Sequence, residues 1–500
     1  MNMEYYYYYP ILCVAIILIS SILLGKLTTT TTPNNLPPGP PRLPIIGNLH
    51  QLGQTPHRSL HRLAAKYGPI MHLKLGTIPT IVISSPHYAK QVLQTHDHVF
   101  SSRYLSDTIC ILNHENMSVG FLPVCSKWRN LRKAIATEFF SQTRLDESQG
   151  IRFKKIQQLV EYVGDNTGKV LDVGFLAFIT MINFMSSSLM SVDLADYNSQ
   201  SSAEFRELVT KSVKLVGKPN LSDFFPVLRY FDPQGLRRDN KTNLGSIIRV
   251  FEDIIDKRMK SKTETSPKND VLDFLLDQGQ EDDLQKLTYQ EIKHLCADVY
   301  VAGVDSTSGT VEWAMTELMR NPSKLAKAQA ELQTAIGKGT PIKESDIPNL
   351  PYLQAIVKET LRLHTPTPLL LPHKAQTDTQ ISGFLLEKGS QVLINVWAMG
   401  RDSNLWCDPL SFEPERFLAL DVDYRGQNFD MIPFGAGRRI CPGLNLAHRM
   451  IPLVLGSLLH EFNWKLEDGA MPEDIDLSDK FGITLHKRLP LRIIPSSRDS

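Results

Sequence analysis

The chain has 500 residues, of which 54 are basic and 53 acidic, so its formal net charge is +1. With 42% hydrophobic residues, this balance excludes a strongly basic nucleic-acid-binding protein and a largely disordered chain. Six scattered cysteines without Cys-x-x-Cys spacing indicate neither a disulfide framework nor a zinc site.

The amino terminus carries five consecutive tyrosines at residues 5–9, followed by an almost unbroken apolar run at residues 11–24. Together they span about twenty residues, which is enough to cross a bilayer with the tyrosines at its interface. A cleaved signal peptide is the alternative, but no basic segment precedes the run, whereas Lys26 and Arg42 follow it. We therefore expect residues 1–26 to form an uncleaved single-pass anchor in contact with membrane lipid of the endoplasmic reticulum, and the rest of the chain to be cytosolic.

Residues 27–48 are rich in threonine and then in proline, a composition that predicts a linker and a stiffened hinge. No repeat and no further boundary follows, so we expect one domain over residues 49–500. Alternating apolar residues at 70–85 predict a hairpin of a small sheet, and most of the remainder reads as helix. The predicted fold is mainly α with a small β portion.

Two later segments have a local pattern with more than one interpretation. Trp128 and Arg132 are four residues apart and would share one helix face, either at a site or as the anchor of a surface helix. Residues 220–235 are apolar and broken by prolines, so they could form a lid, a membrane-facing loop or covered core.

A long helix is predicted from a capping box at Thr288 and Glu291 to Arg320, where Asn-Pro ends it. Its middle, residues 302–307, reads Ala-Gly-Val-Asp-Ser-Thr. Gly303 lacks a side chain, and the neighbouring hydroxyls can bond backbone carbonyls and open the turn, which would make room for a small molecule. A kinked helix with a polar patch is the alternative.

Glu359 and Arg362 are expected to be adjacent on the next helix, which by itself suggests no more than a solvated ion pair. Residues 364–371 then leave the helix, because two prolines enforce an extended path.

Residues 434–443 read Phe-Gly-Ala-Gly-Arg-Arg-Ile-Cys-Pro-Gly and precede a predicted helix. Cys441 would meet unpaired N–H groups at the helix start, which favour a thiolate suited to a metal. The glycines let the backbone turn and let a flat cofactor approach, and Arg439 could pair with a cofactor carboxylate. A buried structural cysteine in a glycine turn is the alternative.

The pattern Phe-x-x-Gly-x-Arg-x-Cys-x-Gly, matched at Phe434, Gly437, Arg439, Cys441 and Gly443, resembles the haem-binding loop of the cytochrome P450 superfamily. The superfamily's Trp-x-x-x-Arg, central-helix, Glu-x-x-Arg and Pro-Glu-Arg-Phe motifs also occur in order, so the resemblance covers essentially the whole chain. It implies the cytochrome P450 fold and haem b with Cys441 as the metal ligand. A thiolate ligand favours O–O cleavage, so the implied reaction is monooxygenation with O2.

The resemblance also implies roles for other cofactor-binding residues. Trp128 and Arg132 would contact a haem propionate. His373 would meet a propionate at a position where arginine is more usual, a contact that is weak unless the imidazole is protonated. Glu359, Arg362 and Arg416 would form a buried triad that locks the haem loop.

At the oxygen site, the resemblance makes Asp305 the acid of the proton path and puts Ser306 at the position of the usual threonine, where Thr307 could assist. This combination argues against a non-oxygenating haem-thiolate isomerase or dehydratase, which would need neither group. The implied substrate-facing residues are mainly apolar, which suits an isoprenoid: Phe121, Ala302, Thr367, Leu369, Leu370 and Ile483.

Residues 462–468 and 479–486 resemble the plant microsomal group that contains geraniol 8-hydroxylase and related terpenoid hydroxylases. This implies a small hydrophobic substrate, most simply a geraniol-type monoterpene or a diterpene, with a small phenolic or alkaloid as the alternative. Electrons would come from NADPH through NADPH-cytochrome P450 reductase. Basic residues could form its docking face, or only a solvated surface: Arg129, Lys133, Arg438 and Arg449. A non-catalytic haem carrier is a further alternative.

Overall fold

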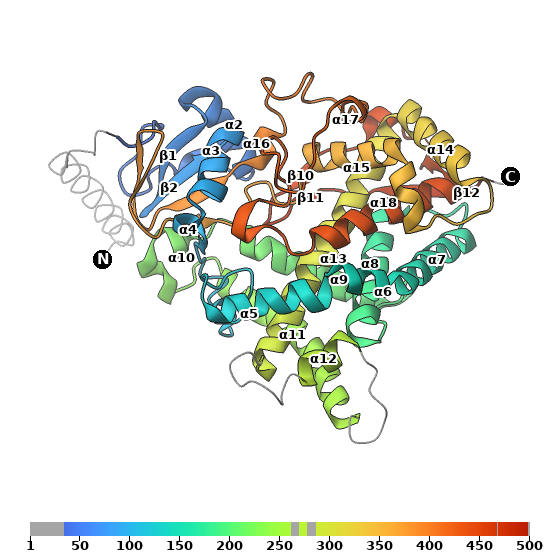
Figure 1. The fold of residues 1–500 in the computed structure, drawn as a ribbon. Coiled ribbons are helices and arrows are strands. Elements are labelled where there is room, and N and C mark those ends of the chain that lie inside the picture. The colour runs from blue at the N-terminus through green and yellow to red at the C-terminus, as the bar shows by residue number, and fades with distance from the viewer. Residues whose placement is uncertain (1–34, 262–269, 278–286, 468, 499–500) are drawn as a thin grey trace, which may run out of the picture.

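The computed structural model describes residues 35–261, 270–277, 287–467 and 469–498. The expected anchor at residues 1–26 and the first part of the expected linker, 27–34, lie outside the described residues. Helices make up most of the described chain, and the strands form small sheets, which confirms a mainly α fold with a small β portion (Figure 1).

The helices are α2 (Pro56–Tyr67), α3 (Pro86–Lys90), α4 (Asp97–Phe100), α5 (Ser126–Ala134), α6 (Gln142–Glu147), α7 (Gln149–Asp165), α8 (Val173–Met190), α9 (Gln200–Gly217), α10 (Leu221–Phe224), α11 (Leu236–Ser261), α12 (Val271–Asp277), α13 (Tyr289–Arg320), α14 (Pro322–Ile336), α15 (Pro351–Leu363), α16 (Val396–Met399), α17 (Arg416–Ala419) and α18 (Leu444–Glu461). Among the described residues, α8 is the one helix that is long and apolar enough to cross a membrane, and 83% of it is buried, as in a core helix.

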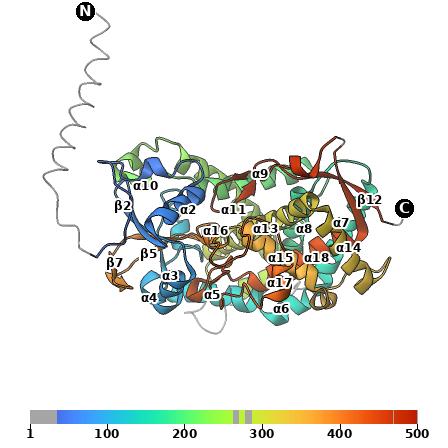
Figure 2. The same ribbon diagram turned by 90° about the horizontal axis from the view of Figure 1, so that it is seen from above.

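The strands are β1 (Ile70–Leu75), β2 (Ile78–Ile83), β3 (Ser102–Arg103), β4 (Leu171–Asp172), β5 (His373–Lys374), β6 (Thr379–Ile381), β7 (Phe384–Leu386), β8 (Gln391–Ile394), β9 (Phe462–Leu466), β10 (Asp479–Lys480), β11 (His486–Lys487) and β12 (Arg492–Ser497). The largest sheet has the order β1-β2-β8-β5-β3, with β2 and β8 parallel and the other pairs antiparallel. It lies at one end of the molecule and β12 lies at the other (Figure 2).

The predicted hairpin is β1 and β2, which pair antiparallel from Ile70 opposite Ile83 to Leu75 opposite Ile78. The second part of the expected linker packs on this hairpin. His72 donates its backbone N–H to Pro38, and Asn48 donates its own to Lys74, at 2.9 and 2.6 Å. The proline-rich stretch directly before residue 49 is therefore fixed to the sheet.

Helix α13 begins where the capping box predicts. The backbone N–H of Glu291 donates to the Thr288 hydroxyl at 3.3 Å, and that of Thr288 donates to the Glu291 carboxylate at 2.7 Å. With 32 residues it is about 48 Å long, enough to cross the domain. It packs against α8, α11, α15 and α18.

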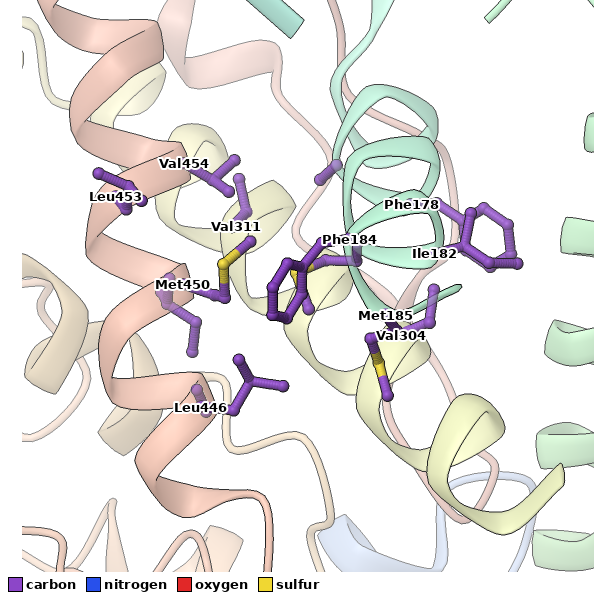
Figure 3. Close-up of a cluster of buried hydrophobic side chains, with 14 of the residues drawn as sticks. Phe178, Ile182, Phe184, Met185, Val304, Val311, Leu446, Met450, Leu453 and Val454 are labelled. Atoms are coloured by element: carbon purple, nitrogen blue, oxygen red, sulfur yellow. The ribbon is translucent and has the colours of Figure 1, made fainter. Parts of the chain in front are cut away.

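The core between α8, α13 and α18 holds the middle of α13 beside the start of α18. Figure 3 shows Val304 of α13 beside Met185 of α8, and Val311, two turns further along α13, beside Met450 and Val454 of α18. Leu446 lies in the first turn after the loop of Cys441. This core therefore fixes the two segments that sequence analysis singled out relative to each other.

Candidate functional site

The loop before α18 has the tight geometry that its glycines predict. Gly435 and Gly437 have φ angles of +70° and +67°, a region that side chains disfavour. A Cβ atom at Gly437 would lie 1.9 Å from the Leu93 carbonyl oxygen, so no larger residue fits there without moving the loop. Cys441 donates its N–H to the Phe434 carbonyl at 2.9 Å, which closes the loop.

The groups around the Cys441 sulfur have opposing effects on the pKa of its thiol. Burial raises the pKa of the thiol, whereas the N–H of Gly443, the Arg132 guanidinium and the N–H of Leu444 lower it. The N–H groups of the helix start therefore favour the thiolate, as expected, but burial outweighs them and the pKa of the thiol is raised overall. Coordination to a metal ion would deprotonate the sulfur instead.

Three guanidinium groups gather beside this loop without a carboxylate partner among the described residues. Arg103, Arg132 and Arg439 donate instead to backbone carbonyls, among them those of Leu371, Ile440 and Ser101, respectively. Burial, and then the neighbouring guanidiniums, lower the pKa of Arg103 to about 9 and that of Arg439 to about 10. A buried positive cluster of this kind calls for an anion.

Two predicted propionate contacts have specific partners in this cluster. His373 donates from Nδ1 to the Phe100 carbonyl at 2.6 Å and accepts at Nε2 from Arg103 at 2.9 Å, so its ring is neutral. Burial, together with the charge of Arg103, holds the pKa of His373 well below its usual range. Trp128 donates Nε1 to the Val119 carbonyl at 3.0 Å, and the Arg439 guanidinium lies 4.6 Å from its ring centre.

These residues fit a haem. Cys441 offers one sulfur ligand, and the unpaired cations Arg103, Arg132 and Arg439 would neutralise two propionates. Because His373 is neutral, Arg103 would supply the charge that the histidine lacks. The role of Arg103 was not predicted, since nothing in its local pattern points to a partner 270 positions away.

The middle of α13 is open on one side. Ala302 is exposed and Ser306 is half-buried, whereas Asp305 and Thr307 are buried. The Ser306 hydroxyl donates to the Ala302 carbonyl at 2.7 Å, as expected for a hydroxyl in a helix. The helix nevertheless stays continuous here.

The space beside Gly303 is occupied by a side chain of α8, whereas its sequence context predicts room for a small molecule. A Cβ atom there would lie 3.0 Å from the Met185 sulfur, so the missing side chain lets α8 approach α13. The predicted space for a small ligand beside Gly303 is therefore filled by Met185, and the exposed face around Ala302 is the open one.

The Asp305 carboxylate points to the carboxyl-terminal part of the chain. The Thr484 hydroxyl donates to Asp305 Oδ2 at 2.7 Å, and His486 Nε2 lies 3.2 Å from the same oxygen. These two partners were not predicted, because 179 positions separate Asp305 from Thr484.

The structure brings Glu359, Arg362 and Arg416 together in a buried group. Arg362 donates to both Glu359 oxygens at 2.7 Å, and Arg416 donates to one of them at 3.1 Å. The side chains of Glu359 and Arg362 have no exposed surface. Arg362 also donates to the Pro409 and Ser411 carbonyls, so the group ties α15 to the segment that leads to the Cys441 loop.

A cavity of about 140 Å³ is lined by four of the predicted substrate-facing residues: Phe121, Leu369, Leu370 and Ile483. Its wall is otherwise formed largely by aliphatic and aromatic side chains, with a few polar groups such as Asp223 and Tyr104. Leu370 has a φ of +50°, a strained conformation of the sort found at ligand sites. Ala302 and Thr367 do not line this cavity.

The segment that carries Phe121 is held on α13 by a polar cluster. His114 Nδ1 lies 2.9 Å from His294 Nδ1, and His114 Nε2 lies 3.3 Å from the Asp298 carboxylate. Asp298 also accepts the Val119 N–H at 2.9 Å. Burial, followed by the His114 charge, lowers the pKa of His294 to about 4.

The four basic residues considered for reductase docking differ in their surroundings. Arg129 and Lys133 are exposed. Arg438 pairs with Asp97 at 3.0 Å and remains 42% exposed. Arg449 pairs with Asp146 and Glu344 and is 15% exposed, so its charge is used in contacts within the chain.

Comparison with known proteins agrees with this geometry. The sequence profile of the family Cytochrome P450 matches residues 37–491. The chain is 50% identical to geraniol 8-hydroxylase of Catharanthus roseus, with 93% of this chain and 94% of that protein covered. It is 49% identical to geraniol 8-hydroxylase of Swertia mussotii, with 92% and 93% covered. It is 47% identical to drimenol monooxygenase of Persicaria hydropiper, with 92% of each covered.

Proposed function

Because the chain belongs to the cytochrome P450 family and is thus a haem-dependent monooxygenase, we propose that it hydroxylates a small terpenoid. A geraniol-type monoterpene or a related diterpene is the substrate class that we favour. The observation that carries this proposal is the apolar cavity at Phe121, Leu369, Leu370 and Ile483. The names of the geraniol and drimenol enzymes, which act on terpenoid alcohols, support it.

The cavity suits such a substrate for a physical reason. Removing an isoprenoid from water gains about 25 cal/mol per Å² of apolar surface, and aliphatic walls provide this without orienting charges. A small phenolic or alkaloid would instead need a polar or charged partner deep in the site. The half-buried carboxyl of Asp223 on the cavity wall, whose pKa burial raises to about 6, is the group that would bind such a substrate, and it makes a phenolic or alkaloid the alternative.

We assign the residues of this chain as follows. When bound, the haem iron activates dioxygen with electrons from a reductase. Cys441 would ligate the iron, and Arg103, Arg132, Arg439 and Trp128 would hold the propionate side. Ser306, on the open side of α13, and the buried Asp305 beside it would hold and pass protons to the oxygen site. Leu369 and Ile483 would orient the substrate and exclude water from it.

NADPH-cytochrome P450 reductase is the electron donor that we propose. Arg129 and Lys133 lie on α5, whose Arg132 donates to the Ile440 carbonyl of the Cys441 loop, and Arg438 lies in that loop. These three residues would form a basic face for an acidic partner. Docking by charge predicts that the rate of electron transfer falls as salt concentration rises.

We also propose that the protein is anchored in the endoplasmic reticulum membrane with its catalytic domain in the cytosol. Large apolar side chains are exposed on both sides of the turn at Gly76 and Thr77. Their exposures are 48% for Leu43 and Ile45, 74% for Val227, 91% for Tyr230 and 76% for Phe231. Gly76 donates to the Ile46 carbonyl and Thr77 donates to that of Phe224, so the two segments are neighbours. Such a patch would lie against lipid.

The test of the substrate is turnover of the full-length protein with NADPH and reductase. Geraniol-type monoterpenes, diterpenes, small phenolics and alkaloids are offered separately, and products are identified by mass spectrometry. We expect a hydroxylated terpenoid whose added oxygen comes from labelled dioxygen. Turnover of phenolics or alkaloids alone would refute the substrate class. A product without labelled oxygen would indicate an isomerase or dehydratase. Carbonate extraction and protease protection of microsomes test the membrane placement.

A further inference from the structure

The carboxyl-terminal hairpin of β10 and β11 lies along the middle of α13. Ile483, between the two strands, lines the substrate cavity. Thr484 and His486 reach the buried carboxylate of Asp305. One short segment therefore contacts both the cavity and the acidic side chain of α13.

The contacts with Asp305 converge on a single oxygen. Oδ2 accepts the Thr484 hydroxyl at 2.7 Å and lies 3.2 Å from His486 Nε2, and the two partners are themselves 3.0 Å apart. Asp305 is 3% exposed, so these partners determine its orientation. Ser306, the next residue, bonds the Ala302 carbonyl instead and does not compete for this carboxylate.

His486 has the charge and the position of a proton donor. Burial lowers its pKa, but the charge and hydrogen bond of Asp305 and the charge of Glu312 raise it more, against a smaller opposing effect of Arg206. The pKa is raised overall, which favours an imidazolium facing the Asp305 carboxylate. The His486 side chain is 20% exposed, in contrast to 3% for Asp305, so the histidine is the member of the pair in contact with water.

We propose that His486 is a positioning residue that, with Thr484, holds the Asp305 carboxylate and returns to it the protons that monooxygenation consumes. The inference rests on the proposed role of Asp305 in proton delivery. Each turnover takes two electrons from the reductase, two protons and one dioxygen molecule, and it yields the hydroxylated substrate and one water. A proton passes from His486 Nε2 to Asp305 Oδ2, and the neutral imidazole is then reprotonated by a proton from the bulk solvent, which is the source of both protons.

The first test measures the pKa of His486 in the holoenzyme, without substrate. Full-length protein labelled with ¹⁵N-histidine is titrated by NMR in its reduced carbon monoxide complex, and the resonance absent from His486→Gln is assigned to His486. We expect this resonance to titrate above 6.5, and its pKa to fall in Asp305→Asn. A His486 pKa that Asp305→Asn leaves unchanged would overturn the proposal.

The second test measures how much of the NADPH consumed appears as product instead of peroxide, between about pH 6 and pH 8. Glutamine at 486 keeps a hydrogen-bond donor but cannot supply a proton. We expect His486→Gln to lower coupled turnover about tenfold, a smaller effect than loss of a directly acting proton donor. In wild type the coupling should decline toward high pH as His486 loses its proton, and this decline should be absent in His486→Gln. His87→Gln is the matched control, because His87 is exposed and distant from His486 in the sequence.

The outcomes separate this inference from the proposed function. Unchanged coupling and an unchanged pH profile in His486→Gln, with its carbon monoxide spectrum intact, would refute the role of His486. If His486→Gln loses that spectrum, Thr484→Val is used as the test variant instead. Lower coupling with an altered pH profile is again the expected result. Failure of every terpenoid to turn over would refute the substrate class. The titration of His486 in wild type and Asp305→Asn needs no substrate, so it would still test the proton transfer from His486 to Asp305.

Discussion

Arg103 on β3 and His373 on β5 are directly opposite each other in an antiparallel strand pair, with Arg103 donating to His373 Nε2 at 2.9 Å. The arginine carries the charge of this pair, because the histidine is neutral and donates its other nitrogen to the Phe100 carbonyl. The pair thus provides one guanidinium for the propionate side of the haem.

We predict that Arg103→Met weakens haem retention. Loss of a hydrogen bond to a charged group costs about 1.5–3 kcal/mol, which corresponds to roughly tenfold to hundredfold faster haem loss to an acceptor protein. Haem transfer to an apo-globin measures this rate. His373→Gln, which removes no charge, is the comparison and should change the rate less. If His373→Gln has the larger effect, the assignment of the charge to Arg103 is wrong.

The buried group of Glu359, Arg362 and Arg416 should be essential for a stable holoenzyme. Arg362→Met leaves the buried Glu359 carboxylate with Arg416 as its remaining charged partner, and breaking a buried pair costs about 3–5 kcal/mol. We expect haem content and the urea-unfolding midpoint both to fall sharply. Arg492→Met breaks the exposed pair with Glu467 and should cost about 0–1 kcal/mol. Equal effects of the two substitutions would contradict a structural role for the buried group.

Sequence reasoning succeeds here where the signal is local or belongs to a family motif. The capping box at Thr288 sets the start of α13, and the alternation of residues 70–85 gives β1 and β2. The contact of Arg416 with Glu359 was available only through the resemblance, because their spacing along the chain has no periodic meaning.

The remaining features depend on tertiary packing that no local pattern encodes. Arg103 meets His373, and Asp305 meets His486, only because short strands pair or dock far along the chain. Met185 fills the space beside Gly303 because α8 crosses α13 there. The Cys441 pKa is raised because the burial of the thiol outweighs the N–H groups of the helix start.

Stability should depend on pH through His294. Its pKa is about 4 in the folded chain and 6.5 in the unfolded chain, so between these values the unfolded chain binds a proton that the folded chain does not. The free energy of unfolding therefore falls as pH falls through this window, by about 1.4 kcal/mol per pH unit for this group. His294→Gln should make the pH dependence of the urea midpoint shallower. The exposed His50→Gln serves as control, and equal slopes in all three proteins would contradict the expectation.

Ser306 should control how efficiently reducing equivalents reach the product. Ser306→Ala removes the hydroxyl on the open face of α13, and we expect peroxide release to rise by roughly fivefold, the equivalent of about 1 kcal/mol. Ser306→Thr keeps the hydroxyl and restricts its rotamer, so its peroxide release should equal or fall below that of wild type. Thr316→Ala removes the same kind of back-bond further along α13 and is the control. Peroxide release equal to wild type in Ser306→Ala would show that Ser306 takes no part.

The sulfur of Cys441 as the iron ligand is the claim on which the other assignments depend. The absorption spectrum of the reduced carbon monoxide complex tests it directly, with full-length wild type compared with Cys441→His. Cys407→Ser is the control, because Cys407 is an exposed cysteine outside the loop. We predict the thiolate-type band in wild type and Cys407→Ser and its loss in Cys441→His. A thiolate-type band that persists in Cys441→His would contradict the assignment.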